Sequence, residues 1–114
     1  MVEGDIVLTP VAQADGQIKN RPALILRQLP PFGDMLVCGI SSQVQQEVVG
    51  FDEIVYTTDS DFAASGLRLT SLIRLSFLAV LPVNRIIGTI GSLARTRRQR
   101  LLRNLADHLL SEAD

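Results

Sequence analysis

The stretch Lys19–Gln43, KNRPALILRQLPPFGDMLVCGISSQ, decides the fold of this chain. It contains two apolar runs, Ala23–Leu26 and Met35–Ile40, joined by a segment rich in Pro and Gly, Gln28–Asp34. Short apolar runs bounded by turn residues predict two buried β-strands. If these strands pair in antiparallel fashion, the beginning of the first lies beside the end of the second.

Polar residues stand at the two strand ends that this pairing brings together. Asn20 and Arg21 precede the first run, and Ser41 and Gln43 close the second. The pairing therefore predicts that Arg21 lies near Ser41 and Gln43 on one rim of a small sheet. Pro22 holds the preceding backbone in the extended region, and its missing N–H predicts a strand start or edge at this point.

The alternation of side chains in the second strand sorts its residues into two faces. One face carries Val37, Gly39, Ser41 and Gln43, and the other carries Leu36, Cys38, Ile40 and Ser42. Gly39 removes bulk beside Ser41, so we expect room there for a ligand or for another backbone.

Composition indicates one globular domain, residues 1–114, with 46% hydrophobic and 20% charged residues. The net charge of −1 excludes a global field that draws the protein to nucleic acid or membrane. Ten of the eleven cationic residues are Arg, which binds phosphate or carboxylate in a bidentate way. A GC-rich genome would produce the same bias.

The cellular compartment follows from three negative observations. Cys38 is the single cysteine and lies inside an apolar run, so we expect a reduced thiol in the core. No apolar stretch approaches the ~20 residues that span a bilayer. The opening residues MVEGDIV lack the features of a signal peptide. We therefore expect a cytoplasmic protein without a membrane segment.

The rest of the chain predicts further short strands and one terminal helix. Expected strands cover Gly4–Val11, Ser71–Leu75 and Arg85–Gly91, and Val44–Tyr56 forms two short strands or one bent strand. Ala12–Asn20 is expected to be a loop with a turn at Asp15-Gly16. Asp59–Ser65 predicts one helical turn that Gly66 closes. Leucines at helical spacing predict a helix over Leu93–Ser111, capped by Ser92 or Gly91. This order indicates a small barrel or sandwich plugged by the helix.

Five arginines crowd the first turns of the expected helix, at positions 95, 97, 98, 100 and 103. Cations in a first turn oppose the helix dipole by roughly 0.3–1 kcal/mol each, so their position needs a reason. They can bind RNA phosphates, bind an acidic partner tail, or form a solvated face balanced by acids of the barrel.

Five short motifs, in order, make the chain resemble the MazF/PemK family of bacterial toxins. These are Gly4-Asp5-Ile6-Val7, Arg21-Pro22-Ala23-Leu24-Ile25-Leu26, Ile40-Ser41-Ser42-Gln43, Gly66-Leu67 with Ser71–Leu75, and Arg85-Ile86-Ile87-Gly88-Thr89-Ile90. The resemblance implies a mainly β domain with some α, namely a partly open, SH3-like β-barrel with a C-terminal helix that assembles as a homodimer. It also implies a metal-independent endoribonuclease without a cofactor, which cleaves single-stranded RNA at short sequences through 2′-OH attack and is inhibited by a cognate antitoxin.

Carried over by motif, the family's catalytic Arg and Thr fall on Arg21 and Ser41, and a second Arg falls on Arg74. Ser41 keeps the hydroxyl of the Thr, whereas Ser76 stands where some members carry an acid. Asp15 can substitute for that acid. The predicted RNA contacts around the three catalytic residues are Asp15, Lys19, Asn20, Gln43 and Ser76.

Two other functions stay open at this stage, and several residues have structural alternatives. A relative of the CcdB branch would act on DNA gyrase, although that branch uses a Trp-bearing tail and this chain has no Trp. An inactive descendant would serve only as a binding module. Arg21 and Arg74 can also be members of ordinary ion pairs. His108 is the only histidine, so the usual ribonuclease pair of histidines is absent, and we expect it to be structural or solvated.

Overall fold

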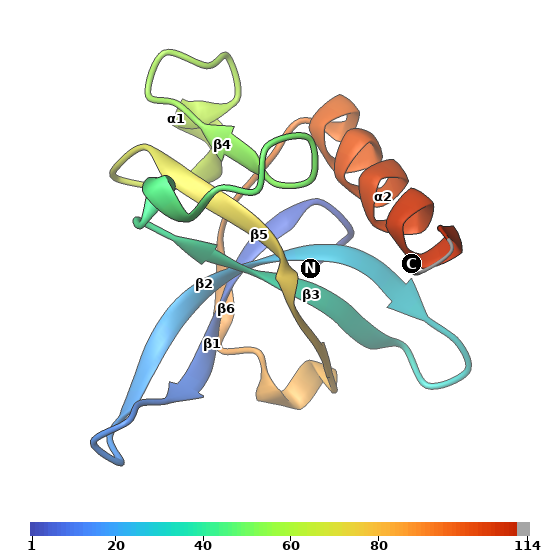
Figure 1. The fold of residues 1–114 in the computed structure, drawn as a ribbon. Helices are drawn as coiled ribbons and strands as arrows, with labels where there is room; N and C mark the ends of the chain where they lie inside the picture. The colour runs from blue at the N-terminus through green and yellow to red at the C-terminus, as the bar shows by residue number, and fades with distance from the viewer. Residues whose placement is uncertain (112–114) are drawn as a thin grey trace.

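The computed structural model describes residues 1–111 and consists of one antiparallel sheet with two helices (Figure 1). The strands are β1 (Asp5–Ala12), β2 (Ile18–Leu29), β3 (Asp34–Ser41), β4 (Glu53–Val55), β5 (Ser71–Leu81) and β6 (Gly88–Ser92). They lie in the order β4-β5-β3-β2-β1-β6. The expected pairing of β2 with β3 is confirmed, with Ala23 opposite Gly39.

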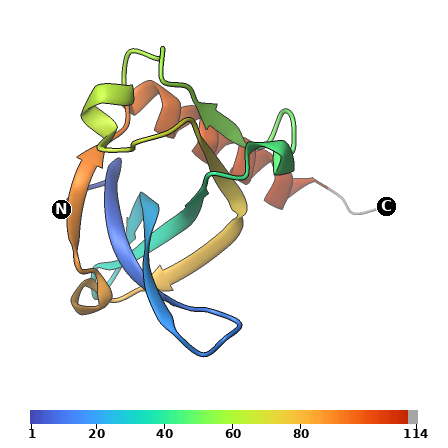
Figure 2. The ribbon, with the colours of Figure 1, turned by 90° about the vertical axis from the view of Figure 1, so that its left-hand side faces the viewer.

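The sheet curls into an open half-barrel, which Figure 2 shows from the side. One face packs against helix α2 (Arg95–Leu110) and buries a core that includes Leu24, Cys38, Ile73 and Leu101. The other face buries a smaller cluster, Val7, Ala23, Ile25, Met35, Val37 and Ile86. The mainly β, partly open barrel with a C-terminal helix is therefore the observed architecture.

The predicted loop Ala12–Asn20 was wrong at both ends. β1 continues to Ala12 and β2 begins at Ile18, so the two strands form a hairpin that projects from the barrel (Figure 2). The exposed side chains gave no apolar alternation from which to recognise a strand. Pro22 lies inside β2 rather than at its start, but the pairing with β3 begins only at Ala23, so the edge position is confirmed.

Only part of the predicted strand structure in Val44–Tyr56 is observed. Its first residues form a single 3₁₀ turn, Val44–Gln46, and one short strand, β4, follows. The helical turn predicted after Asp59 is confirmed as α1 (Phe62–Ser65), and Gly66 closes it in the left-handed conformation with φ of 72°.

Helix α2 has no side-chain cap, so the predicted cap at Ser92 or Gly91 was wrong. Ala94 holds the N-cap position. Gly91 instead permits a close approach of two segments, because a Cβ there would lie 2.3 Å from the carbonyl carbon of Ser65. The helix is attached to the barrel through its arginines rather than through a cap.

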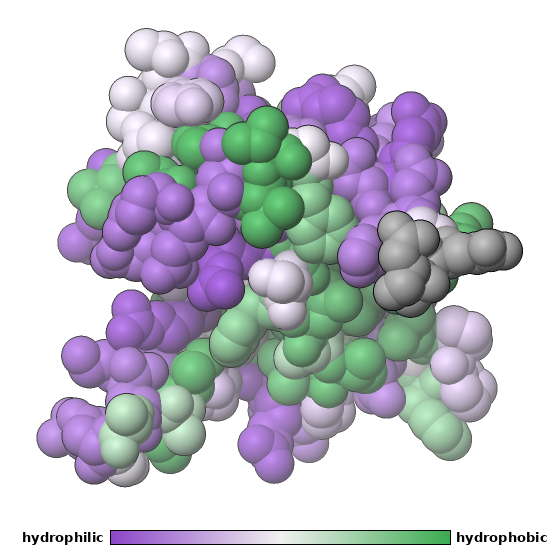
Figure 3. Space-filling view, viewed as in Figure 1, coloured by the Kyte–Doolittle hydropathy of each residue, from purple (hydrophilic) through white to green (hydrophobic). Residues whose placement is uncertain are grey.

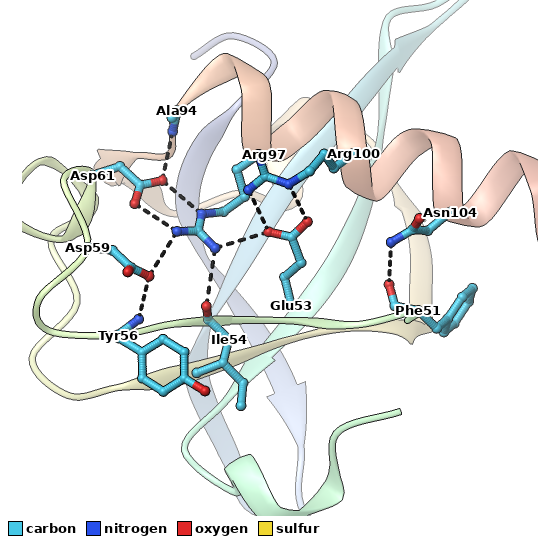
Figure 4. A network of polar contacts seen from close by, with 10 residues as sticks. All are labelled: Phe51, Glu53, Ile54, Tyr56, Asp59, Asp61, Ala94, Arg97, Arg100 and Asn104. Carbon is cyan, nitrogen blue, oxygen red and sulfur yellow. Dashed lines mark hydrogen bonds and ion pairs between the residues drawn. The ribbon is translucent and has the colours of Figure 1, made fainter. Parts of the chain in front are cut away.

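Arg97 and Arg100 bind carboxylates of the barrel side of the molecule (Figure 4). The Arg97 guanidinium donates to Asp61 through Nε at 2.9 Å and Nη2 at 3.0 Å, and also reaches Asp59 and Glu53. Arg100 donates to both oxygens of Glu53. Arg97 is 8% exposed, and its hydrogen bonds lower the pKa of Asp61 and raise its own.

Arg98 forms a weaker version of the same attachment, with Nη1 3.6 Å from Glu3. Three of the five clustered arginines therefore contact acids, as the third alternative predicted, but Arg97 is buried and not part of a solvated face. Arg95 and Arg103 are exposed and form no ion pair within residues 1–111.

Within residues 1–111, no helix is long and apolar enough to cross a membrane.

Candidate functional site

A pocket of ≈ 640 Å³ opens between β1, β2, β3, β5 and the loop that follows α1. Its floor is apolar and includes Ala23, Val37 and Leu81 from the smaller core cluster. Its polar lining consists of Thr9, Arg21, Ser41, Ser42, Gln43, Gln46, Arg68, Ser71 and Arg74. The three predicted catalytic residues thus line one pocket.

Arg21 and Ser41 approach the pocket from neighbouring strands, as the predicted pairing requires. Arg21 is exposed, and its Nη2 donates to Gln13 Oε1 at 3.1 Å. The backbone carbonyl of Arg21 accepts from Thr9 Oγ1, which ties this residue to β1. Ser41 Oγ accepts from the backbone N–H of Gln43 at 3.0 Å, which leaves the hydroxyl proton for another acceptor.

Arg74 reaches the pocket from β5, where it pairs with Gly39 of β3. Its guanidinium forms no hydrogen bond or ion pair to residues 1–111, so the structural alternative of an ion pair is not observed. The space that Gly39 leaves is taken by Phe77, because a Cβ at Gly39 would lie 2.8 Å from Phe77 Cδ1. The expectation of a ligand or a backbone at this point was therefore wrong.

The charge of the lining is one-sided. Arg21, Arg68 and Arg74 all contribute to it, and none of the Asp and Glu residues within 1–111 does. None of these three guanidinium groups has a carboxylate of residues 1–111 within ion-pair distance. Unpaired cations that converge on an apolar concave surface favour a polyanionic ligand with planar apolar groups.

Four of the predicted RNA contacts lie outside the lining of the pocket. Lys19 and Asn20 are exposed on the projecting hairpin, and Asp15 lies in its turn, where the carboxylate accepts from the N–H of Gln17 at 2.9 Å. Ser76 is exposed but lies in an irregular part of β5. Gln43 is the only predicted RNA contact in the lining.

Six polar residues in or beside the lining were not predicted as site residues, namely Thr9, Gln13, Ser42, Gln46, Arg68 and Ser71. Gln13 orients Arg21, Gln46 lines the pocket from the unpredicted 3₁₀ turn, and Arg68 lines it from the loop after α1. The loop is fixed at both ends, because Ser65 Oγ accepts from the N–H of Leu67 and Ser71 Oγ donates to the carbonyl of Leu69. The Gly66 signal predicted where this loop begins, but not which face it would cover.

Cys38 lies on the opposite face of β3 and takes no part in the site. It is fully buried, and burial raises the pKa of its thiol to about 12, so a thiolate nucleophile is unavailable. Among residues 1–111, no group of three or more His, Cys, Asp or Glu side chains is arranged to hold a metal ion.

Comparison with known proteins supplies the family. Residues 3–109 match the model of the PemK-like, MazF-like toxin of type II toxin–antitoxin systems. The fold is similar to that of Mycobacterium tuberculosis toxin MazF-mt6, with a TM-score of 0.67 and 21% sequence identity over 96% of this chain and 99% of that one. No curated protein matches the sequence. Because the family model covers nearly all of the chain, this protein belongs to the PemK-like, MazF-like toxins of type II toxin–antitoxin systems.

Proposed function

We propose that the protein is a sequence-specific endoribonuclease that cleaves single-stranded RNA in the pocket of Arg21, Ser41 and Arg74. The observation that carries the proposal is the lining of that pocket, to which the described part of the chain contributes three arginines and no carboxylate. The phosphate backbone of RNA would neutralise these charges, and its bases would contact the apolar floor. Members of this family are typically endoribonucleases, which agrees with the lining.

The reaction would use the nucleophile that RNA itself carries. The 2′ oxygen releases its proton to solvent water and forms a bond to the adjacent phosphorus while the bond from phosphorus to the 5′ oxygen breaks. The 5′ oxygen gains a proton, which leaves a 2′,3′-cyclic phosphate and a 5′-OH end. Arg21 and Arg74 would stabilise the extra negative charge of the phosphorane, and the Ser41 hydroxyl would donate to one of its oxygens. The delocalised positive charge of a guanidinium suits Arg21 to charge stabilisation, and the same group can also supply a proton to the leaving 5′ oxygen.

Digestion of a long RNA in EDTA, followed by mapping of the new 5′ ends, tests the proposal. We expect cuts at one short sequence with 5′-OH ends for the wild type, and cleavage that is slower by about 10²–10³ for Arg21→Ala. Arg95→Ala is the matched control, since Arg95 is equally exposed and lies outside the pocket. Intact RNA with the wild type, or equal cleavage by wild type and Arg21→Ala, would refute the proposal.

The proposed partners are the RNA substrate, a second copy of the chain and the cognate antitoxin of a type II system. The second copy has a candidate surface on the distal half of β5, on the same side of the sheet as α2 but beyond the residues that the helix covers. Figure 3 shows apolar side chains over the distal half of β5, where Leu78 and Val80 are 41% and 53% exposed. Sedimentation equilibrium should give a dimer for the wild type and a monomer for Leu78→Glu with Val80→Glu. A monomeric wild type would exclude this interface.

A further inference from the structure

Phe77 is a half-exposed aromatic side chain in the lining of the pocket. Its exposed fraction is 53%, and no other aromatic residue contributes to the lining. Of the described apolar residues, those on the same side of β5, Ala79 and Leu81, also line the pocket, whereas Leu78 and Val80 point to the other face. The ring therefore belongs to the pocket and not to the apolar surface of Leu78 and Val80.

Gly39 sets the position of the ring against the backbone of β3. A Cβ on this residue would lie 2.8 Å from Phe77 Cδ1 and 3.3 Å from Cγ, so any side chain at position 39 would displace the ring. Gly39 pairs with Arg74 and lies two residues from Ser41 on the same face of β3. That spacing is about 6.6 Å along a strand, so the ring adjoins the proposed catalytic groups.

A shift in the pairing of β5 with β3 places the Phe77 ring beside Gly39. Cys38 pairs with Leu78 and Gly39 with Arg74, so three residues of β5, Leu75–Phe77, have no partner on β3. The buried carboxylate of Asp52 holds the extra loop, because its Oδ1 accepts from the N–H of Leu75 at 3.0 Å. Its Oδ2 accepts from the N–H of Val48 at 2.9 Å. The backbone that carries Phe77 is thus fixed before any ligand binds.

We propose that Phe77 is a stacking platform for one RNA base beside the cleaved phosphate, an inference that rests on the proposed ribonuclease function. An aromatic face next to guanidinium groups is the arrangement that binds unpaired bases, since the base stacks while its phosphates meet the cations. The platform would hold the nucleotide in register with Ser41 and Arg74. Part of the sequence preference would then come from how well each base stacks.

The chain offers a clean spectroscopic test because it contains no Trp. In Phe77→Trp, the only indole would lie in the pocket, and we expect its fluorescence to be quenched by an RNA oligonucleotide that spans the mapped cleavage site, with a 2′-O-methyl group at the cut position. Phe32→Trp is the matched control, since Phe32 is 88% exposed and outside the pocket, and its signal should not change.

Affinity for the same oligonucleotide should fall by about 5- to 150-fold in Phe77→Ala, the range of one lost stack, and should be kept in Phe77→Tyr. Phe77→Leu separates stacking from apolar contact, because it keeps bulk but has no aromatic face. Unchanged affinity in Phe77→Ala and Phe77→Leu would overturn the inference. So would a Phe77→Trp signal that follows protein concentration rather than RNA, because the ring would then be a dimer contact.

The inference and the function on which it rests can fail separately. If the wild type cleaves RNA and Phe77→Ala binds it equally well, only the platform is refuted. If the wild type neither cleaves nor binds RNA, the proposed function is refuted, and so is the stacking role of Phe77. Melting temperatures of all variants should stay within a few degrees of the wild type, since the ring is half-exposed.

Discussion

The arginines of helix α2 and those of the pocket differ in what surrounds their guanidinium groups. Arg97 is buried among three carboxylates, and Arg100 donates hydrogen bonds to both oxygens of one of them, Glu53 (Figure 4). Arg21, Arg68 and Arg74 face a concave surface to which no carboxylate of residues 1–111 contributes. The same side chain therefore stabilises the fold where carboxylates surround it and stays available for a ligand where none does.

Removing the buried arginine should produce the largest effect, and the effect should be on stability. Arg97→Ala would leave Asp61 buried without its partner, so we expect the free energy of unfolding to fall by about 3–5 kcal/mol. Urea denaturation measures the change, and Arg95→Ala should stay within about 0.5 kcal/mol of the wild type. A loss below about 1 kcal/mol would show that the helix does not depend on this network.

Removing a pocket arginine should have the opposite profile. Arg21→Ala should lower the cleavage rate by about 10²–10³, the loss typical of one donor to a developing oxyanion. Its unfolding curve should match that of the wild type, because the Arg21 side chain is exposed and bonds only to Gln13 among residues 1–111. Equal losses of rate and stability would mean that Arg21 acts through the fold.

The network at Arg97 also predicts acid sensitivity. The pKa of Asp61 is lowered chiefly by its hydrogen bonds from Arg97, so the folded state favours the charged carboxylate. That stabilisation is complete above the unfolded pKa of about 3.9 and is lost as pH falls below it through the folded pKa. Chemical denaturation at a series of pH values should show this decline. Asp61→Asn should be less stable at neutral pH and show a flatter decline; a parallel curve would contradict the assignment.

Arg68 should show the smallest effect, because it is exposed at the edge of the pocket. Arg68→Ala should raise KM severalfold and leave kcat nearly unchanged, as expected for a phosphate bound equally in the ground and transition states. Arg68→Lys should recover most of the loss, since a single phosphate contact needs only a charge. Steady-state cleavage of a short RNA gives both constants. A fall in kcat alone would place Arg68 at the reacting phosphate instead.

The sequence predicted the parts of the fold that depend on local pattern. The apolar runs of β2 and β3 and the leucines of α2 appear where their periodicity placed them. The hairpin arm Ile18–Asn20 could not be recognised, because both of its faces are exposed and carry no alternation. The irregularity at Leu75–Phe77 depends on Asp52, which lies 23 residues away from Leu75, so no local signal could reveal it.

The residues of the site likewise divide into those that local pattern predicts and those that depend on tertiary packing. The sequence predicts that Arg21 and Ser41 lie together, because β2 and β3 are consecutive strands joined by one short segment and pair in antiparallel fashion. Arg68 and Gln46 enter the pocket through loops whose course depends on tertiary packing, so their contribution was missed. Ser76 was assigned from the family motif, as the residue two positions after Arg74, and the irregularity in β5 removes it from the lining.

The salt dependence of RNA binding tests most directly whether the pocket arginines are the charges that meet RNA. The wild type and the triple variant Arg21→Ala, Arg68→Ala, Arg74→Ala would be titrated with the 2′-O-methyl oligonucleotide over a range of salt concentrations. For single-stranded RNA, each phosphate contact contributes about 0.7 to the slope of log K against log salt concentration, so the triple variant should have a slope shallower by about 2. Equal slopes in the two proteins, with both folded, would show that RNA is bound elsewhere or not at all.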